Sequence, residues 1–271
     1  MTPPQLRAEN LTVAYGDRPV LDSIDIEIPS QAITAIVGPN GCGKSTLLRA
    51  MGRVLTPRAG AVLLDAEPVH RLSTRAVART LGLLPQSNVV PEQLTVADLV
   101  VRGRYPHRGA FGRWSTTDQR AVDEALAATG TTELADRLVD ELSGGQRQRA
   151  WIAMVLAQQT PILLLDEPTT YLDLAHRIEI LRLLRTLNTH HGVTVVMVLH
   201  DLDEASRYAD HLIALRDGAI TAQGDPREIV TPTLVETVFG VTCTTIPDPI
   251  TGTPLIIPLD AAHDTHPASA G

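Results

Sequence analysis

The sequence has 271 residues, a formal net charge of -8 and a hydrophobic share of 44%. This length fits one large domain, or a domain with a small appendage, that buries a core. The acidic balance argues weakly against a dedicated nucleic-acid binder. Residues 1–10 hold no apolar stretch for a signal peptide, and the apolar runs are far shorter than a membrane span. We therefore expect a soluble, cytoplasmic protein that needs an embedded partner to act at a membrane.

Lys44 is the only lysine, because 22 of the 23 Lys and Arg residues are arginines. This excludes every motif that needs a second lysine, such as another phosphate-binding loop or the guanine-recognising Asn-Lys-x-Asp. The arginine preference itself is typical of a genomic composition bias. Cys42 and Cys243 have no spacing that indicates a metal site or a disulfide, so we expect two free thiols.

Short apolar runs alternate with longer helical stretches, which indicates a largely parallel α/β sheet. In such sheets ligands bind at the carboxyl ends of the strands. Four runs end in chemically useful residues: AITAIV before Gly38, LGLLP before Gln86, ILLL before Asp166 and Glu167, and VTVVMVL before His200. If these strands are neighbours, the residues that follow them share one edge of the sheet.

The first of these strand ends continues into GPNGCGKST, a G-x-x-x-x-G-K-[ST] phosphate-binding loop between a strand and a helix. Backbone N–H groups and the helix N-terminus would surround the phosphates. Lys44 would contact the β and γ phosphates and Ser45 would ligate Mg²⁺. The helix is predicted to bury a stripe of Leu47, Leu48, Met51, Val54 and Leu55. The predicted nucleotide-binding residues of the loop are Gly38, Pro39, Asn40, Gly41, Cys42, Gly43, Lys44, Ser45 and Thr46.

Two carboxylates follow the third strand. Asp166 can hold the metal through its hydration shell, and Glu167 is placed to orient and polarise an attacking water. An ordinary salt bridge at a strand end is the alternative. His200, after the fourth strand, can stabilise the γ-phosphate, although a single histidine is as often structural.

Two helices are expected between residues 116 and 158. In TTDQRAVDEALAATG, Thr117 can cap a helix that keeps Val122 and Leu126 on one face. In LSGGQRQRAWIAMVLAQ, a hydroxyl and flexible backbone precede a helical run that ends at Thr160-Pro161. This predicts a second anion site at Ser143, Gly144, Gly145 and Gln146. An ordinary N-cap at Ser143 explains the pattern equally well.

The order GPNGCGKST, Gln86, LSGGQ, ILLLDEP and His200 closely resembles the ATP-binding-cassette (ABC) ATPases, over nearly the whole chain to about residue 224. The resemblance implies an α/β P-loop NTPase (RecA-like) core with an N-terminal antiparallel β-subdomain. An α-helical signature subdomain would be inserted at about 87–160. One cassette domain would span 1–240, followed at 241–271 by a hairpin around Gly252 and a disordered tail.

The resemblance also implies roles for single residues. Tyr15 would stack on adenine, Gln86 would sense the metal and the γ-phosphate, and residues 170–173 would form the D-loop. Glu167, His200 and Gln86 would be the catalytic residues, with ATP and Mg²⁺ as cofactors and Ser45, Gln86 and Asp166 at the metal. Each LSGGQ would face the phosphate loop of another protomer, which predicts a head-to-tail homodimer or a dimer with a similar cassette.

Three classes of function fit such a chain: the motor of a membrane transporter, a cassette acting on DNA or ribosomes, and another phosphate-loop enzyme. LSGGQ disfavours the third class. The second usually carries two cassettes or a long coiled coil, whereas only 56 positions (142 − 86) separate the two motifs here. We therefore expect a transporter ATPase, peripheral on the cytoplasmic face of the cell membrane, with an integral membrane permease as a separate chain.

The segment 87–114 is the expected contact with that permease. It carries Arg102, Arg104, Arg108 and Arg113 together with Tyr105, Phe111 and Trp114. Composition alone favours a solvated loop, but in the family this region receives the permease's coupling helix. TVADLVVRGRYPHRG and EPTTYLDLAHRIEIL resemble the importers of ferric siderophores, with haem and cobalamin importers as near relatives. A substrate-binding protein would then act on the chain indirectly.

Two further features of the sequence concern the subgroup and a metal site. Arg177, in AHRIEIL, stands where Gln is more usual in the subgroup. His190 and His191 invite a metal-site interpretation, but we expect them in a polar connection between a helix and a strand.

Overall fold

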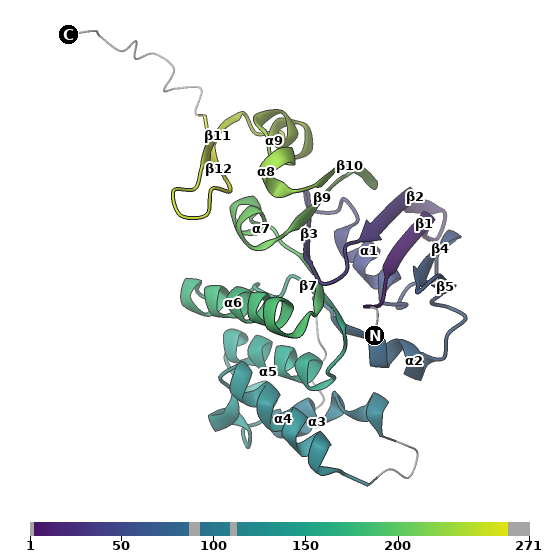
Figure 1. Cartoon of the computed structure of the whole chain (residues 1–271), viewed down its shortest axis with the longest axis vertical. Coiled ribbons are helices and arrows are strands. Elements are labelled where there is room, and N and C mark those ends of the chain that lie inside the picture. The colour runs from purple at the N-terminus through teal and green to yellow at the C-terminus, as the bar shows by residue number, and fades with distance from the viewer. Residues whose placement is uncertain (1–2, 87–92, 109–112, 260–271) are drawn as a thin grey trace, which may run out of the picture.

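The computed structural model describes residues 3–86, 93–108 and 113–259 (Figure 1). A six-stranded sheet with the order β10-β9-β3-β8-β7-β6 forms its centre. Five of the strands pair in parallel, and the edge strand β10 pairs antiparallel with β9. The strands are β3 (Ile33–Val37), β6 (Leu81–Leu84), β7 (Ile162–Asp166), β8 (Thr194–Val198), β9 (His211–Arg216) and β10 (Ala219–Gly224). The four predicted strand ends therefore do lie on neighbouring strands, and this prediction is confirmed.

Both faces of this sheet are covered, so β3, β7 and β8 are buried at every residue. Alternate side chains point to opposite faces. Ile36, Leu164 and Val196 join the core with α1 (Lys44–Met51), beside which lies α2 (Thr74–Thr80). Ala35 and Leu163 join the core on the other face. That face is covered by α6 (Leu174–His191), α7 (Leu202–Tyr208), α8 (Pro226–Ile229) and α9 (Pro232–Phe239).

A second, antiparallel sheet covers α1 from the other side and has the order β2-β1-β4-β5. Its strands are β1 (Leu6–Tyr15), β2 (Arg18–Ile28), β4 (Ala59–Leu64) and β5 (Glu67–Pro68). Leu11 of β1 and Leu21 of β2 are fully buried in the same core as Leu47 and Leu48 of α1. The N-terminal antiparallel β-subdomain is thus confirmed, and it holds the helix that follows the phosphate loop.

Helices between β6 and β7 form a third unit, at the bottom of Figure 1. Its elements are α3 (Val96–Arg102), η1 (Tyr105–His107), α4 (Thr116–Ala128), η2 (Thr132–Leu134), η3 (Val139–Glu141) and α5 (Gly144–Ala157). These helices bury a core of their own that includes Leu99, Val122 and Ala153. The inserted helical subdomain of the predicted fold class is confirmed.

The start of α4 differs from the prediction. Ser115, not Thr117, is the N-cap, and Ser115 and Asp118 form a reciprocal capping box. Thr117 lies inside the first turn, because the carboxylate three residues after Ser115 stabilises the earlier start. Asp118 also forms an ion pair with the buried Arg104, whose Nε lies 3.0 Å from Asp118 Oδ1. The Ser115 hydroxyl and the Arg104 guanidinium hold the pKa of Asp118 below its ordinary value.

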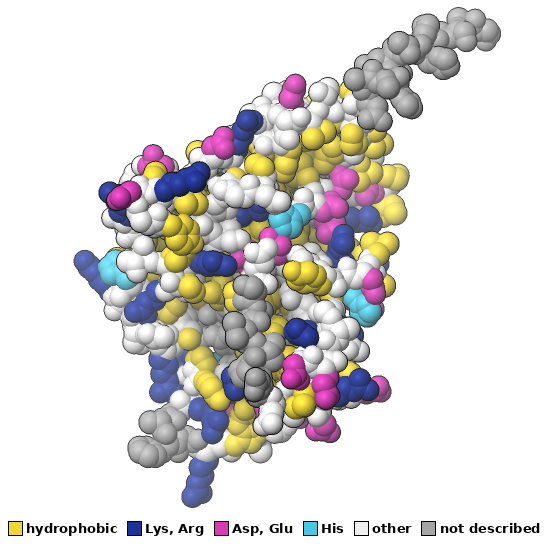
Figure 2. All heavy atoms as spheres, turned by 180° about the vertical axis from the view of Figure 1, so that it is seen from behind, with side chains coloured by type: hydrophobic (Ala, Val, Ile, Leu, Met, Phe, Trp, Pro, Cys, Tyr) yellow, Lys and Arg dark blue, Asp and Glu magenta, His cyan; other side chains and the backbone are white. Residues whose placement is uncertain are grey.

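Exposed arginines gather over α2 and the start of α4, as the dark blue side chains at the lower left of Figure 2 indicate. They are Arg71, Arg75, Arg79, Arg113 and Arg120. Arg75 and Arg79 each donate from Nε to the carbonyl of Pro106 at 2.9 Å, which joins α2 to η1. Among the described residues from 68 to 120, the only acidic ones are Asp98 and Asp118. This edge is therefore basic in a protein of net charge -8.

After α9, β11 (Cys243–Pro247) and β12 (Pro254–Pro258) form a hairpin. Gly252 in its turn has a positive φ of 70°. The Asp203 carboxylate of α7 accepts a hydrogen bond from the backbone N–H of Ile256 at 2.8 Å, which attaches β12 to α7. The predicted tail, residues 261–271, lies outside the described residues, as does Phe111.

Two smaller predictions were wrong. Val54 is 60% exposed, because α1 ends at Met51. His190 and His191 form the last turn of α6, which Gly192 ends in a left-handed conformation. Across the described ranges, no three His, Cys, Asp or Glu side chains are grouped as metal ligands. Nor does any helix in those ranges have both the length and the apolar character that crossing a bilayer demands.

Candidate functional site

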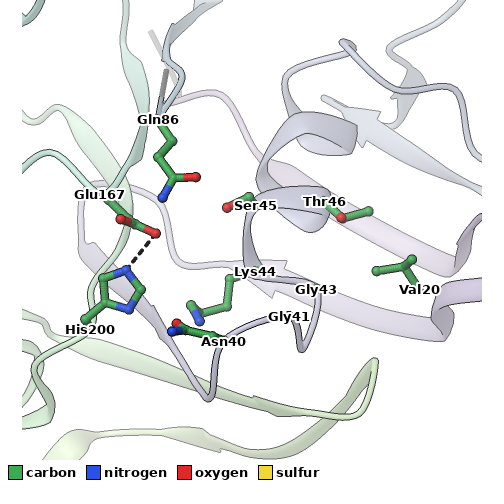
Figure 3. Close-up of a pocket in the computed structure, with 10 residues that line it drawn as sticks. All are labelled: Val20, Asn40, Gly41, Gly43, Lys44, Ser45, Thr46, Gln86, Glu167 and His200. Carbon is green, nitrogen blue, oxygen red and sulfur yellow. Dashed lines mark ion pairs between the residues drawn. The ribbon is translucent and has the colours of Figure 1, made fainter. Parts of the chain in front are cut away.

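A cavity of about 360 Å³ opens at the carboxyl ends of the neighbouring strands β3, β6, β7 and β8 (Figure 3). Its walls come from the phosphate loop, from the residues that follow the other three strands, and from β2. The lining residues are Val20, Asn40, Gly41, Gly43, Lys44, Ser45, Thr46, Gln86, Glu167 and His200. The structure therefore brings together in one cavity residues from all four predicted strand ends.

The phosphate loop is held by close packing that only glycine permits. Gly38 has a φ of 149°, and a Cβ there would lie 2.1 Å from the carbonyl oxygen of Leu215 in β9. Gly43 has a φ of 110°, and a Cβ there would lie 2.7 Å from the Leu21 side chain of β2. The loop is thus wedged between the two sheets. No side chain caps α1, so the backbone N–H groups of its first turn are available to an anion.

The ammonium group of Lys44 lies inside this loop. The side chain is 5% exposed, and Nζ donates to the carbonyl oxygens of Gly38 and Pro39 at 2.8 and 2.9 Å. Cys42 packs behind the loop and does not line the cavity. Burial raises the pKa of the Cys42 thiol, although nearby Lys44 opposes the shift. Gly38, Pro39 and Cys42 therefore shape the loop, while Lys44 supplies its positive charge.

Ser45 and Asp166 form the part of the site that suits a divalent cation. The Ser45 hydroxyl donates to Asp166 Oδ1 at 2.8 Å. Asp166 is fully buried, and its Oδ2 has no partner among the described residues. Burial raises the pKa of Asp166, against the lowering effect of the Ser45 hydrogen bond. A buried carboxylate oxygen without a partner, beside a hydroxyl and the Gln86 amide, is a donor set that fits Mg²⁺.

Glu167 and His200 face each other across the end of β7 and β8. His200 Nε2 lies 2.6 Å from Glu167 Oε1, and the Thr170 hydroxyl donates to Glu167 Oε2 at 3.1 Å. Glu167 is 7% exposed and has a φ of 55°, a strained conformation for a residue other than glycine. Figure 3 shows the Gln86 amide above the space between Glu167 and Ser45, with Lys44 below. The carboxylate is thus fixed at the edge of the cavity.

The other predicted binding residues lie outside this cavity. Tyr15 ends β1 and is 51% exposed. Ser143 caps α5 in a capping box, with Gln146 N donating to Ser143 Oγ at 3.3 Å and Ser143 N to Gln146 Oε1 at 3.1 Å. Gly144 and Gly145 pack against residues 171–172 of the D-loop. The sequence's second predicted anion site is therefore an N-cap within this chain, away from Lys44.

The contacts of three residues around the site were not predicted from the sequence. Val20 lines the cavity from β2, and an apolar residue in an antiparallel strand carries no signal of such a place. Thr170 holds Glu167, and its position three residues after the carboxylate was the available signal. Arg177 pairs with Glu204, with Nη1 3.1 Å from Oε1, and this pair spans 27 sequence positions that no local pattern connects.

Comparison with known proteins gives a consistent picture. The family model described as ABC transporter matches residues 21–170. The ferric enterobactin transport ATP-binding protein of Escherichia coli (strain K12) is 56% identical over 255 residues, which cover 94% of each chain. The achromobactin transport ATP-binding protein of Dickeya dadantii (strain 3937) is 53% identical, over 93% of this chain and 94% of the relative. The cobalamin import ATP-binding protein of Halobacterium salinarum is 42% identical over 96% of this chain and 66% of the relative.

Solved structures agree with these relatives. An inward-facing conformation of a metal-chelate type ABC transporter superposes with a TM-score of 0.81 at 28% identity, covering 96% of this chain and 99% of that chain. A dimeric ATP-binding cassette in a post-hydrolysis state, bound to ADP and Pi, superposes with a TM-score of 0.73 at 30% identity. It covers 81% of this chain and 98% of that cassette.

Proposed function

The chain belongs to the ABC transporter family, and we propose that it is the ATP-hydrolysing subunit of an importer that takes up ferric siderophores through a separate permease. The observation that carries the ATPase is the joint placement of two pairs at one cavity. Ser45 Oγ lies 2.8 Å from Asp166 Oδ1, and His200 Nε2 lies 2.6 Å from Glu167 Oε1. The substrate rests on the 56% identity with the ferric enterobactin relative over 94% of both chains.

In this proposal the phosphate loop binds ATP and Mg²⁺ assists. The backbone N–H groups before α1 and the Lys44 ammonium bind the β and γ phosphates. Ser45, Gln86 and Asp166 would hold Mg²⁺, which would neutralise charge that develops on the phosphates. Lys44 Nζ donates to the carbonyls of Gly38 and Pro39, which leaves its third N–H for a charge-assisted bond to phosphate.

Glu167 and His200 then carry the hydrolysis. Glu167 accepts a hydrogen bond from the attacking water and polarises it, while the imidazole of His200 donates to the γ-phosphate. For this His200 must exchange its contact with Glu167 Oε1 for one with the phosphate. The Thr170 hydroxyl keeps the carboxylate of Glu167 oriented during that exchange.

A second protomer completes the site. The α5 N-terminus, with Ser143, Gly144, Gly145 and Gln146, lies outside the Lys44 cavity, so it can reach an ATP molecule only in another chain. The dimeric cassette among the solved structures shows that such folds associate in pairs. We therefore propose a head-to-tail homodimer, or a dimer with a similar cassette, in which Tyr15 stacks on adenine.

The predicted segment 87–114, next to the basic edge over α2 and the start of α4, is the proposed contact with a permease, and the chain would lie on the cytoplasmic face of the membrane. Arg102, Arg108 and Arg113 remain candidates for that contact. Arg104 does not, because it is 3% exposed and binds Asp118, the Ala157 carbonyl and Gln159. Its charge holds the helical subdomain together. The substrate-binding protein would contact the permease and not this chain.

Uptake of radiolabelled iron tests the proposal. A strain that lacks its own copy of the gene is complemented with wild type or with Glu167→Gln, and accumulation of ferric siderophore, haem and cobalamin is compared. We expect only ferric siderophore uptake to fail with the variant. Normal iron uptake together with failed cobalamin or haem uptake would mean that the same ATPase serves an importer of those substrates. Normal uptake of all three would contradict the transport function.

A further inference from the structure

A second cavity, of about 260 Å³, lies behind the nucleotide cavity and shares Glu167 and His200 with it. The Glu167–His200 contact therefore stands between the two spaces. The second cavity is enclosed by the loop after β7, the first turns of α6 and the start of α7. Its lining residues are Glu167, Thr169, Thr170, Tyr171, Arg177, Val198, Leu199, His200, Asp201 and Glu204.

An ion pair crosses this cavity between two helices. Arg177 belongs to the first turns of α6, and its backbone N–H donates to the Asp173 carbonyl at 2.9 Å. Glu204 belongs to the first turn of α7. Their side chains are 35% and 17% exposed, so the pair is largely shielded from water. Burial raises the pKa of Glu204, and the Arg177 guanidinium opposes that shift.

His200 depends on α7 for its position. It directly precedes Asp201, the N-cap of α7, and its side chain is 47% exposed. The imidazole is held by Glu167 alone among the contacts of the described residues. The helix has seven residues, of which Ala205 and Ser206 are buried and Leu202 and Tyr208 pack against the core. Its charged side chains add further ties to this packing.

Those ties act in two directions. Toward the C-terminal hairpin, Asp203 accepts from Ile256 N, and Arg207 lies 3.5 Å from Asp248. Toward α6, Arg185 Nη2 donates to the carbonyl of Tyr208 at the end of α7, at 2.7 Å, and Arg177 pairs with Glu204 at its start. Asp173, the last residue of the predicted D-loop, is the N-cap of α6, so this pair joins the helix after the D-loop to the helix after His200.

We propose that Arg177 and Glu204 are positioning residues that hold His200 in register with Glu167 through α7. The inference rests on the proposed ATPase and adds to it a pair that contacts neither nucleotide nor metal. Removing one partner leaves the other charge in a shielded place without compensation, whereas removing both leaves two amides of similar shape that can bond each other. The position of His200 therefore depends on whether the two side chains can bond each other, more than on either charge alone.

A double-mutant cycle in the full-length chain tests this proposal. Arg177→Gln, Glu204→Gln and the double variant are compared with wild type for kcat, for ATP dissociation constant without turnover, and for Tm. Each single variant is expected to lower kcat about 10-fold, and the double variant is expected to recover to within about threefold of wild type, a coupling in the range of contacting residues. The ATP dissociation constant should change less than about twofold, because the pair lies outside the phosphate loop.

Arg182→Gln is the matched control, because Arg182 is an exposed arginine on the same helix, and it should leave kcat unchanged. Unchanged kcat in both single variants would overturn the proposal, as would losses that multiply in the double variant. A purely structural pair would lower Tm and amount of active protein while leaving kcat per active site intact. If a single variant does not fold, the exchanged pair Arg177→Glu with Glu204→Arg replaces it, and kcat below a tenth of wild type in that folded variant contradicts the proposal.

The proposed ATPase is checked separately in the same assay. Wild type must hydrolyse ATP and Glu167→Gln must not. If that difference holds and the cycle shows no coupling, the ATPase stands and the positioning role fails. If wild type itself has no ATPase activity, the proposed function fails first.

Discussion

The phosphate loop and the signature loop, LSGGQ at residues 142–146, both place glycines at a helix N-terminus, yet the two N-termini are capped in different ways. Gly43 precedes α1 in a left-handed conformation and provides no side-chain cap. Ser143 precedes α5 and forms a capping box with Gln146. The first helix therefore presents N–H groups without a side-chain cap beside a buried ammonium, whereas in the second the N–H of Gln146 is already bonded to the Ser143 hydroxyl.

This difference separates two functions that the sequence presents as similar. A phosphate can bind the first loop within one chain, because no side-chain cap there must be displaced. At the second loop the N–H groups of Gln146 and Ser143 are already bonded within the capping box, at 3.3 and 3.1 Å. We infer that the first loop determines affinity for ATP and that the second contributes once two protomers close on the nucleotide.

Removing the chemistry while keeping both loops gives the largest expected effect. Glu167→Gln should lower the rate of phosphate release about a thousandfold, because the amide cannot polarise the attacking water as the carboxylate does. The variant should still bind ATP. It should then accumulate as an ATP-bound dimer in which both loops contact nucleotide. Light scattering with saturating ATP and Mg²⁺ measures the mass, and a monomer there would contradict the two-loop site.

Blocking the second loop tests whether it acts across protomers. Ser143→Arg places a long side chain where the partner's ATP should lie, so turnover should fall about a hundredfold or more, a loss of the size seen when an essential group is removed. ATP binding by the single chain should stay within about twofold of wild type, since α5 lies outside the Lys44 cavity. Calorimetry measures the ATP dissociation constant, and phosphate release measures the turnover. Normal turnover in the variant would exclude a role for Ser143 opposite ATP.

Weakening the first loop should alter affinity. Lys44→Ala removes the only side-chain ammonium in the cavity and is expected to raise the ATP dissociation constant about 10- to 100-fold, the range of a hydrogen bond to a charged group. The change is checked by calorimetry, with circular dichroism to confirm that the variant is folded. An unchanged dissociation constant would mean that backbone N–H groups alone bind the phosphates.

The capping box offers the smallest change. Ser143→Ala should destabilise the start of α5 by about 1 kcal/mol and lower Tm by roughly 2–4 °C. Gln146→Ala serves as the matched change on the other half of the box and should have a similar or smaller effect. If both variants keep the wild-type Tm, the Ser143 hydroxyl is not needed as a cap and is free to serve a ligand.

The strand ends were predictable because they depend on local patterns. A buried run followed by a polar residue indicates a strand end, and parallel strands place these ends on one edge, so Gln86, Asp166, Glu167 and His200 could be grouped before the sheet order was known. The start of α4 was not resolved by the same means. Ser115 and Thr117 are both good caps, and the choice depends on Asp118 completing the box.

Other features depend on contacts between distant residues and were beyond sequence patterns. Arg104 looks like one of several surface arginines, and only the meeting of α3, α4 and α5 buries it against Asp118. Arg177 appeared as a departure from the related importers, and its meaning becomes visible when α7 brings Glu204 within 3.1 Å. In both cases the partner of an arginine is determined by tertiary packing, which periodicity does not encode.

The burial of a unique ammonium has a practical consequence for chemical labelling. Lys44 is the only side chain in the sequence that an amine-acylating reagent can modify, and it is 5% exposed within its own loop. Acylation there would report on a single atom, and bound ATP should shield that atom by contact with its phosphates. The extent of acylation of one peptide, measured by mass spectrometry, would then report how much of the nucleotide cavity is occupied. No probe has to be introduced, and no correction for labelling at other lysines is needed.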